Sequence, residues 1–394
     1  MNRINFLDLG YQPLANNYLN KNNKNKKEKK YRLKVCFNKI TKVVSIEKTF
    51  SSKMMFNNRY PYRSSMSKTM IKSLKNLSKL IKKKYKPKKI LEIGSNDGAF
   101  IKNFKKNEII GVEPCANVET ITKKLKYNTY PEYWSKKLSK KILKKNGAVD
   151  LIYSANTISH IKDLNEVFLA INIILKKDGV LILEDPSLLE CLKRNTYDQF
   201  YNEHIYVFSA IALENILKKY NLGIFKIDKL SIHGGSNRYF IKKIANKRKI
   251  NKSTNIHKKN EINYGLENIN TYKKFANRVK KSKNQLINLF DKLRKKNKKI
   301  IGYGATAKST TILNYCNIST KSIDYFLDTT KDKQNKFTPG TKIPILKYKG
   351  FIEKDVNYIF LGAWNFKDEI FKKENIFIKN GGKFIIHTPK PKII

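Results

Sequence analysis

Two segments of this chain share one order of features: a short apolar strand, a glycine-containing loop and the start of a helix. The first runs from Ile90 to Gly98 and the second from Ile300 to Lys308. Further short apolar strands and helical stretches alternate after each of them. Such alternation is typical of a mostly parallel sheet that is covered by helices. The sequence therefore predicts an α/β chain with two Rossmann-like units.

The 394 residues separate into four regions by their patterns. The length alone suggests two or three domains, at about 100–200 residues per domain. The predicted regions are a small irregular N-terminal domain (1–85, with a helix from Met66 to Lys84), a central Rossmann-like domain (86–245), a charged connector with one long helix (246–298) and a smaller C-terminal Rossmann-like domain (299–394).

The chain is strongly basic, with 83 Lys plus Arg against 31 Asp plus Glu and a net charge of +52. Only nine of the basic residues are arginines, and Asn and Ile are abundant as well. Lys, Asn and Ile share AT-rich codons, whereas nucleic-acid binders favour Arg and gather their charge on one face. We therefore attribute the charge to genome composition and expect no specific nucleic-acid partner. Some attraction to anionic substrates follows in either case.

Apolar runs and cysteines bear on the cellular setting. No apolar run approaches the roughly 18 residues of a membrane span, and the first residues lack the layout of a secretory signal. The four cysteines lie far apart without a C-x-x-C pair (Cys36, Cys115, Cys191 and Cys316). This usage favours a reducing cytoplasm and no membrane partner. A monomer and a homodimer are both compatible with the sequence.

The first glycine loop has the chemistry of an S-adenosylmethionine site. Glu92 ends the first strand and is followed by Gly94 and Gly98, and Glu113 ends the next strand, where an acid commonly holds ribose hydroxyls. Asn96 stands where a dinucleotide loop would have its middle glycine, and a sulfonium with an amino group favours nearby acids. The predicted cofactor-binding residues are Glu92, Gly94, Asn96, Asp97, Gly98, Glu113, Pro114 and Asn156.

The second glycine loop, from Gly302 to Lys308, favours an anion. Backbone N–H groups at such a helix start attract negative charge, and Lys308 adds a cation. The loop matches the G-x-G-x-x-A variant of a dinucleotide fingerprint loosely, with Asp328 as the acid for a ribose. A nicotinamide-dependent oxidoreductase therefore stays as an alternative. Trp364 and Asn365 could stack on a base or fill the core.

Eight motifs in order carry a resemblance over nearly the whole chain: LEIGSNDGAF, GVEP, ANTISH, YDQFYNEH, HGGSNR, GYGATAK, FTPGTKIPI and GAWNFKDEI. Together they resemble the sugar C-methyltransferases, which methylate carbon 3 of nucleotide-linked 4-keto-hexoses. The resemblance implies three parts: an N-terminal zinc domain, a central methyltransferase domain and a C-terminal Rossmann-like domain. It also implies a nucleotide-linked sugar substrate in the cleft between them.

The resemblance assigns roles to residues by position. It implies a catalytic set of His204, Glu203, Tyr201, His160 and Tyr62. Because His204 lies in the densest run of proton-transfer side chains, we expect it to be the base, with His160 as its competitor. Glu203 would orient or electrostatically support His204, and the tyrosines would stabilise an enolate. The expected substrate-binding residues are His233, Gly234, Gly235, Ser236, Tyr303, Lys308 and Asn365. Without the resemblance, YNEH could be a packed aromatic loop and HGGS a plain hairpin turn.

The chain departs from that family at two places. Only Cys36 remains of the expected cysteine pairs, with Lys39 where its partner would stand. Because tetrahedral zinc usually takes four N or S ligands, we expect no zinc and no other metal. Asn202 replaces a histidine beside Glu203. A catalytically dead methyltransferase fold that binds nucleic acid is a second alternative.

Overall fold

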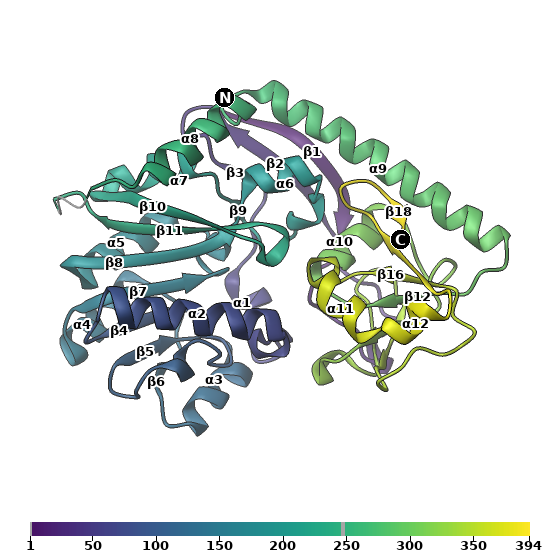
Figure 1. Ribbon diagram of the computed structural model, residues 1–394, viewed down its shortest axis with the longest axis horizontal. Coiled ribbons are helices and arrows are strands. Elements are labelled where there is room, and N and C mark those ends of the chain that lie inside the picture. The colour runs from purple at the N-terminus through teal and green to yellow at the C-terminus, as the bar shows by residue number, and fades with distance from the viewer. Residues whose placement is uncertain (1, 246–248) are drawn as a thin grey trace.

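The computed structural model describes residues 2–245 and 249–394, and in these ranges the strands form three sheets (Figure 1). A four-stranded sheet has the order β1-β2-β3-β9. A central seven-stranded sheet has the order β10-β11-β8-β7-β4-β5-β6. A C-terminal seven-stranded sheet has the order β14-β15-β13-β12-β16-β17-β18. The α/β class with two Rossmann-like units is therefore confirmed.

The N-terminal region is a sheet rather than the irregular segment expected. Its strands are β1 (Arg3–Gln12), β2 (Tyr31–Asn38), β3 (Val44–Ile46) and β9 (Tyr206–Val207). β2 buries Leu33 and Val35 on one face, as a half-buried strand should, and its last part is buried on both faces, at Val35, Cys36 and Phe37. In β1, register shifts between Asn5 and Leu7 and between Asp8 and Tyr11 interrupt the alternation. These irregularities hide the strand in the sequence, since one extra residue reverses the face of every side chain that follows.

The central sheet has five parallel strands and an antiparallel pair at one edge. Its strands are β4 (Ile90–Ile93), β5 (Ile109–Val112), β6 (Asn128–Tyr130), β7 (Val149–Ala155), β8 (Leu175–Pro186), β10 (Leu222–Leu230) and β11 (Ser236–Lys243). The helices around it are α1 (Ser52–Met55), α2 (Lys68–Lys84), α3 (Ala116–Lys124), α4 (Lys136–Asn146), α5 (Leu164–Ile174), α6 (Leu188–Arg194) and α7 (Ala210–Leu217). The predicted helix ending at Lys84 begins at Lys68, because the Ser67 hydroxyl caps it by accepting from the Met70 N–H.

The connector contains two helices, α8 (Lys252–Tyr264) and α9 (Ile269–Lys295), rather than one. Gly265 ends α8 with a φ of +85°, a conformation that glycine adopts readily. The first connector residues, 246–248, lie outside the described residues. α9 extends from the central domain along the C-terminal domain in Figure 1, and its buried face includes Tyr272, Phe275 and Phe290.

The C-terminal sheet begins with the strand that leads into the second glycine loop. Its strands are β12 (Ile300–Tyr303), β13 (Phe326–Asp328), β14 (Lys336–Phe337), β15 (Pro344–Lys347), β16 (Tyr358–Leu361), β17 (Lys383–Ile386) and β18 (Lys392–Ile393), and its helices are α10 (Ala307–Tyr315), α11 (Lys367–Lys373) and α12 (Asn375–Lys379). The N-terminal segment is attached to this domain as well. Tyr18 donates its hydroxyl to the Ala305 carbonyl at 2.7 Å, and Leu19 pairs with Phe337.

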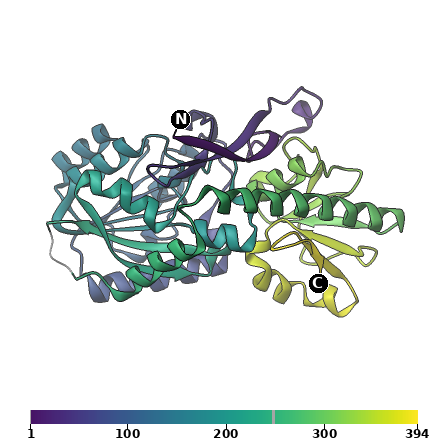
Figure 2. The same cartoon turned by 90° about the horizontal axis from the view of Figure 1, so that it is seen from above.

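The three parts enclose one large cavity of about 1210 Å³. The carboxyl ends of the central strands and the second glycine loop both line it, as does the N-terminal segment through Asn16. Figure 2 shows the N-terminal strands above the place where the other two domains meet. Ligands of open α/β sheets bind at the carboxyl ends of the strands, so this cavity is the candidate site. None of the described helices is both long and apolar enough to cross a membrane.

Candidate active site

The first glycine loop forms one end of the cavity. Gly94 follows β4 with a φ of +79°, and a Cβ there would lie 2.1 Å from the Thr157 hydroxyl oxygen. Glu113 follows β5, and its carboxylate accepts hydrogen bonds from the backbone N–H groups of Asn96 (2.9 Å) and Cys115 (2.8 Å). Glu113, at the end of β5, therefore contacts the glycine loop that follows β4.

Carboxylates with unused bonding capacity gather at this end. Among the described residues, Glu92 Oε2 and Asp97 Oδ1 are buried without a hydrogen-bond partner. Burial raises the pKa of Glu92 well above its usual value, and the charges of Asp97 and Glu113 raise it further. Burial also raises the pKa of Glu113. A bound cation would relieve this repulsion, so the residues present fit the sulfonium and ammonium groups of S-adenosylmethionine.

The other predicted cofactor residues fall into two groups. Pro114 and Asn156 line the cavity, as do Glu92, Gly94, Asn96 and Glu113. Gly98 and Asp97 are not among the residues that line it. A Cβ on Gly98 would lie 2.7 Å from Thr122 Cγ2, so this glycine allows the loop to pack on α3.

Residues 63–65, which the sequence analysis did not assign, lie on the glycine loop. The Ser64 N–H donates to Asn96 Oδ1 at 2.9 Å, and the Ser65 hydroxyl donates to Asp97 Oδ2 at 2.5 Å. Arg63 forms an ion pair at 2.8 Å with Asp332 of the C-terminal domain. The sequence YPYRSSMS, residues 60–67, which contains this segment, was the available signal.

Replacing Glu113 by alanine is expected to weaken S-adenosylmethionine binding by about 1–3 kcal/mol, because ribose hydroxyls and two backbone N–H groups would lose an acceptor. Isothermal titration calorimetry measures this loss, and Glu108→Ala, just before β5, is the matched control. Equal affinity in the Glu113 variant and the wild type would contradict the assignment.

His204 lines the same cavity and lies in the turn that precedes β9. Its Nδ1–H donates to the Gln199 main-chain carbonyl at 2.8 Å, and its Nε2 accepts from the Tyr201 hydroxyl at 2.5 Å. A carbonyl can only accept, so it assigns the proton to Nδ1 and leaves the lone pair on Nε2. Burial lowers the pKa of His204 well below its usual value, and the neighbouring His160 and Lys308 lower it further. The ring is therefore a neutral imidazole whose basic nitrogen, Nε2, faces the Tyr201 hydroxyl.

His160 stacks on His204. Their ring centroids are 4.9 Å apart, and Phe56 stacks on His160 with its centroid at 5.4 Å. Within the described residues, His160 Nε2 is buried without a hydrogen-bond partner. Burial lowers the pKa of His160 to about 3, so this ring is also neutral. The structure thus brings the two predicted competing bases into contact.

Glu203 does not orient His204 as expected. Its carboxylate accepts from the Asn16 amide at 2.8 Å, and the Tyr60 hydroxyl lies 3.5 Å from the other oxygen. Adjacent residues in this turn point apart, and the Gln199 carbonyl orients His204 instead. Burial raises the pKa of Glu203 to about 7. Tyr62, the remaining predicted catalytic residue, lines the cavity and is 36% exposed.

The HGGS turn contributes one residue to the cavity. His233 lines it, and its φ of +54° is unusual for a residue other than glycine. The two glycines lie against Trp364 and Glu190, which occupy the space that a Cβ would need. The Ser236 hydroxyl donates to the Ile232 carbonyl within the turn. Gly234, Gly235 and Ser236 therefore shape the turn rather than face the cavity.

The second glycine loop also lines the cavity, through Tyr303, Lys308 and neighbouring residues, with Asn365 beside them. The Tyr303 hydroxyl donates to Glu374 at 2.9 Å, so it is engaged within the C-terminal domain. Lys308 is buried, which lowers the pKa of its ammonium group, and its Nζ lies 3.4 Å from the His233 carbonyl. An anionic ligand group would stabilise its charge.

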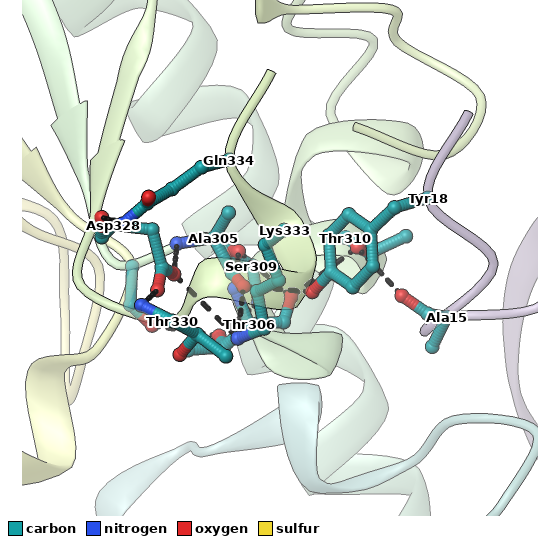
Figure 3. Close-up of polar contacts among 11 residues, drawn as sticks. Ala15, Tyr18, Ala305, Thr306, Ser309, Thr310, Asp328, Thr330, Lys333 and Gln334 are labelled. Carbon is teal, nitrogen blue, oxygen red and sulfur yellow. Dashed lines mark hydrogen bonds and ion pairs between the residues drawn. The ribbon is translucent and has the colours of Figure 1, made fainter. Parts of the chain in front are cut away.

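Asp328 lines the cavity and is also hydrogen-bonded within its own domain (Figure 3). Its carboxylate accepts from the N–H groups of Ala305 (2.9 Å) and Thr330 (2.8 Å), and the Lys333 ammonium lies 3.5 Å away. A Cβ on Gly304 would lie 2.5 Å from the Ala363 Cβ, so this glycine is explained by packing. Two backbone N–H groups donate to Asp328, as two do to Glu113, so these contacts do not separate a ribose acid from a structural one.

Comparisons with known proteins match the three structural parts. Residues 1–56 match a putative zinc binding domain, residues 62–226 a methyltransferase domain, and residues 231–389 a C-methyltransferase C-terminal domain. The C-methyltransferase NovU of Streptomyces niveus is 29% identical over 307 residues, which cover 77% of this chain and 73% of NovU.

Solved structures with similarity to this chain include two methyltransferases. One is a SAM-dependent methyltransferase of Thermotoga maritima, described as a possible histamine N-methyltransferase. It is 19% identical, with 43% of this chain and 88% of that chain covered and a TM-score of 0.33. The other is an S-adenosylmethionine-dependent methyltransferase of Clostridium acetobutylicum. It is 16% identical, with coverage of 44% and 91% and a TM-score of 0.35.

The residues of the N-terminal domain do not fit a zinc ion, although the domain matches a putative zinc binding domain. Residues 1–56 contain one cysteine, Cys36, and no histidine. Arg3 donates to the Cys36 sulfur at 3.0 Å, to Ser45 Oγ at 3.2 Å and to the Ile46 carbonyl at 3.1 Å. The Arg3 guanidinium thus joins β1, β2 and β3 by hydrogen bonds. It occupies the Cys36 sulfur, which a metal ion would need as a ligand.

Removal of metal is therefore expected to leave the stability of the protein unchanged. Purified protein should contain no stoichiometric zinc by elemental analysis, and a chelator should not lower its melting temperature. Arg3→Met is the informative variant: it removes the guanidinium that joins the strands, so it should lower the melting temperature. About one zinc per chain, lost together with stability on chelation, would contradict this account.

Proposed function

We propose that this S-adenosylmethionine-dependent C-methyltransferase transfers a methyl group to a carbon next to the keto group of a nucleotide-linked deoxysugar. The observation that carries the proposal is the neutral His204, whose Nε2 lone pair is held beside the Tyr201 hydroxyl in the shared cavity. Methylation of carbon requires a carbanion, and a neighbouring ketone makes the proton removable. A directed neutral base and a phenol are the groups that such a step needs.

The resting hydrogen bond suggests the order of events. When a keto sugar binds, the Tyr201 hydroxyl turns from His204 Nε2 to the ketone oxygen. The freed Nε2 then takes the proton from the adjacent carbon, and the electron pair of the C–H bond becomes that of an enolate. Tyr201 and Tyr62 donate to the enolate oxygen. The Gln199 carbonyl, which holds the Nδ1–H, stabilises the imidazolium that forms.

The cofactor supplies an electrophilic methyl group on a sulfonium when it is bound. Glu92 and Glu113 would hold its cationic and ribose ends. The methyl group that it would supply to the enolate carbon would leave the C–S electron pair on the sulfur, giving S-adenosylhomocysteine. The neutral state of His160 keeps a second positive charge away from the sulfonium.

A pyrophosphate-linked sugar fits the second half of the cavity. Four cationic side chains line it: Arg63, Lys308, Lys372 and Lys373. Two phosphate charges would pair with these groups, and the sugar would then lie between the C-terminal domain and the Tyr201–His204 turn. The high overall basic charge assists the approach of such an anion.

Incubation of the purified protein with methyl-labelled S-adenosylmethionine and a panel of nucleotide-linked 4-keto sugars tests the proposal. We expect label in one or a few of the nucleotide-linked keto sugars and none in their 4-hydroxy counterparts, which cannot form the enolate. Equal labelling of the 4-hydroxy sugars would contradict the carbanion chemistry.

A further inference from the structure

The catalytic turn is held from behind by the C-terminal domain. Asp198 has no exposed surface, and one of its carboxylate oxygens accepts the Trp364 indole N–H at 2.6 Å. The other oxygen lies 3.4 Å from Nε2 of His387, which follows β17. A carboxylate of the central domain is thus buried between two side chains of the C-terminal domain.

Trp364 also supports the HGGS turn. Its ring occupies the space beside Gly234, where a Cβ would lie 2.2 Å from Cη2 of the indole. The carbonyl of His233 in this turn accepts the Gln199 side-chain amide at 2.7 Å. Lys308 lies over the indole, 5.4 Å from the ring centroid. The side chain of Gln199 is therefore held by the HGGS turn, which Trp364 supports. Its main chain is held through the preceding residue, Asp198, which Trp364 also bonds.

The main-chain carbonyl of Gln199 is the group that accepts the Nδ1–H of His204. This bond sets the tautomer, and with it the nitrogen that faces Tyr201. A main-chain carbonyl cannot be reoriented without moving the residues on either side of it, and the residue on one side is Asp198. The two hydrogen bonds of residues 198 and 199 thus connect the C-terminal domain to the imidazole.

We propose that Asp198 and Trp364 are positioning residues, whose hydrogen bond fixes the Gln199 carbonyl and thereby the tautomer and orientation of His204. The inference rests on the proposed function in one respect, the role of His204 as the base. On this proposal the C-terminal domain serves proton abstraction as well as substrate binding. A Trp364 that only filled the interface between domains would stabilise the protein without affecting the imidazole.

The tautomer of His204 can be read directly by NMR on full-length protein with 15N-labelled histidine. The chain has five histidines, so His204 can be assigned with a His204→Gln spectrum. Wild-type protein should show the proton on Nδ1. Trp364→Phe and Asp198→Ala each remove the bond and should give a mixture of both tautomers. Asp198→Asn keeps an acceptor oxygen for Trp364 and should restore the wild-type pattern.

A matched control separates positioning from loss of stability. Glu261 is another fully buried carboxylate, and it accepts from the N–H groups of Ala210 (2.9 Å) and Ile211 (3.1 Å) at the start of α7. Glu261→Gln should lower the melting temperature and leave the His204 tautomer unchanged. A His204 signal that responds to Glu261→Gln as it does to Trp364→Phe would overturn the proposal.

The kinetic result should follow the spectrum. Methyl transfer by Trp364→Phe should lose about 10- to 100-fold in kcat, as expected for a misplaced base, with the affinity for S-adenosylmethionine unchanged. An unchanged tautomer in both Trp364→Phe and Asp198→Ala would overturn the proposal, as would Asp198→Asn behaving like Asp198→Ala. The tautomer is read without a sugar, so inactivity of the wild type toward every sugar would contradict only the proposed function.

Discussion

Replacing His204 by alanine is expected to lower kcat for methyl transfer by about 100-fold or more, the usual effect of a missing general base. S-adenosylmethionine should still bind with wild-type affinity, because the acids proposed to hold it lie at the ends of β4 and β5, whereas His204 lies in the turn before β9. Calorimetry for the cofactor and a labelled-methyl assay for the reaction check the two halves of this prediction. Weaker cofactor binding together with lost activity would point to a structural effect.

Proton exchange separates abstraction from methyl transfer. With S-adenosylhomocysteine bound, the wild-type enzyme should exchange the proton beside the ketone with deuterated water, and His204→Ala should not. His160→Ala is the matched comparison, since His160 is the neutral ring stacked on His204. Near-normal exchange in His204→Ala with its loss in His160→Ala would transfer the role of base to His160.

Replacing Glu203 by glutamine is expected to stabilise the protein above neutral pH. Burial raises the pKa of Glu203 to about 7, from 4.5 for a free glutamate. The folded state therefore holds this proton more tightly than the unfolded state does. Its contribution to stability is fully present below about pH 4.5 and is lost as the pH rises through 7. A shift of this size corresponds to about 3 kcal/mol.

The difference between the two proteins isolates this residue from the other buried acids. The free energies of unfolding of wild type and Glu203→Gln should be equal near pH 4.5. By pH 8 the free energy of unfolding of the variant should be the larger. Urea unfolding across this range measures both curves. The glutamine can keep the bond from Asn16, so the packing of the site is preserved. Parallel curves at all pH values would contradict the raised pKa.

The fold was predictable where the residues of a single helix or strand carry an uninterrupted apolar pattern. The apolar strands before both glycine loops form β4 and β12, and the helix that ends at Lys84 is present. β1 was missed because its register shifts interrupt the alternation of buried residues. β9 was missed because two residues, Tyr206 and Val207, carry no periodic signal.

The site was predictable where residues lie at strand ends, as Glu92 does in β4 and Glu113 does just after β5. Its finer contacts depend on segments that are far apart in the sequence. Asn16 bonds to Glu203 across 187 residues, and Trp364 bonds to Asp198 across 166 residues. No local pattern indicates such pairs, so the sequence assigned the orientation of His204 to the adjacent Glu203 rather than to the Gln199 carbonyl.

The position of the transferred methyl group tests the central claim most directly. The enzyme is supplied with 13C-methyl S-adenosylmethionine and a nucleotide-linked 4-keto sugar, and the product is examined by 13C NMR. The account predicts a methyl group bonded to the carbon beside the ketone, formed by wild type and lost with His204→Ala. A methyl group bonded to oxygen or nitrogen would contradict it.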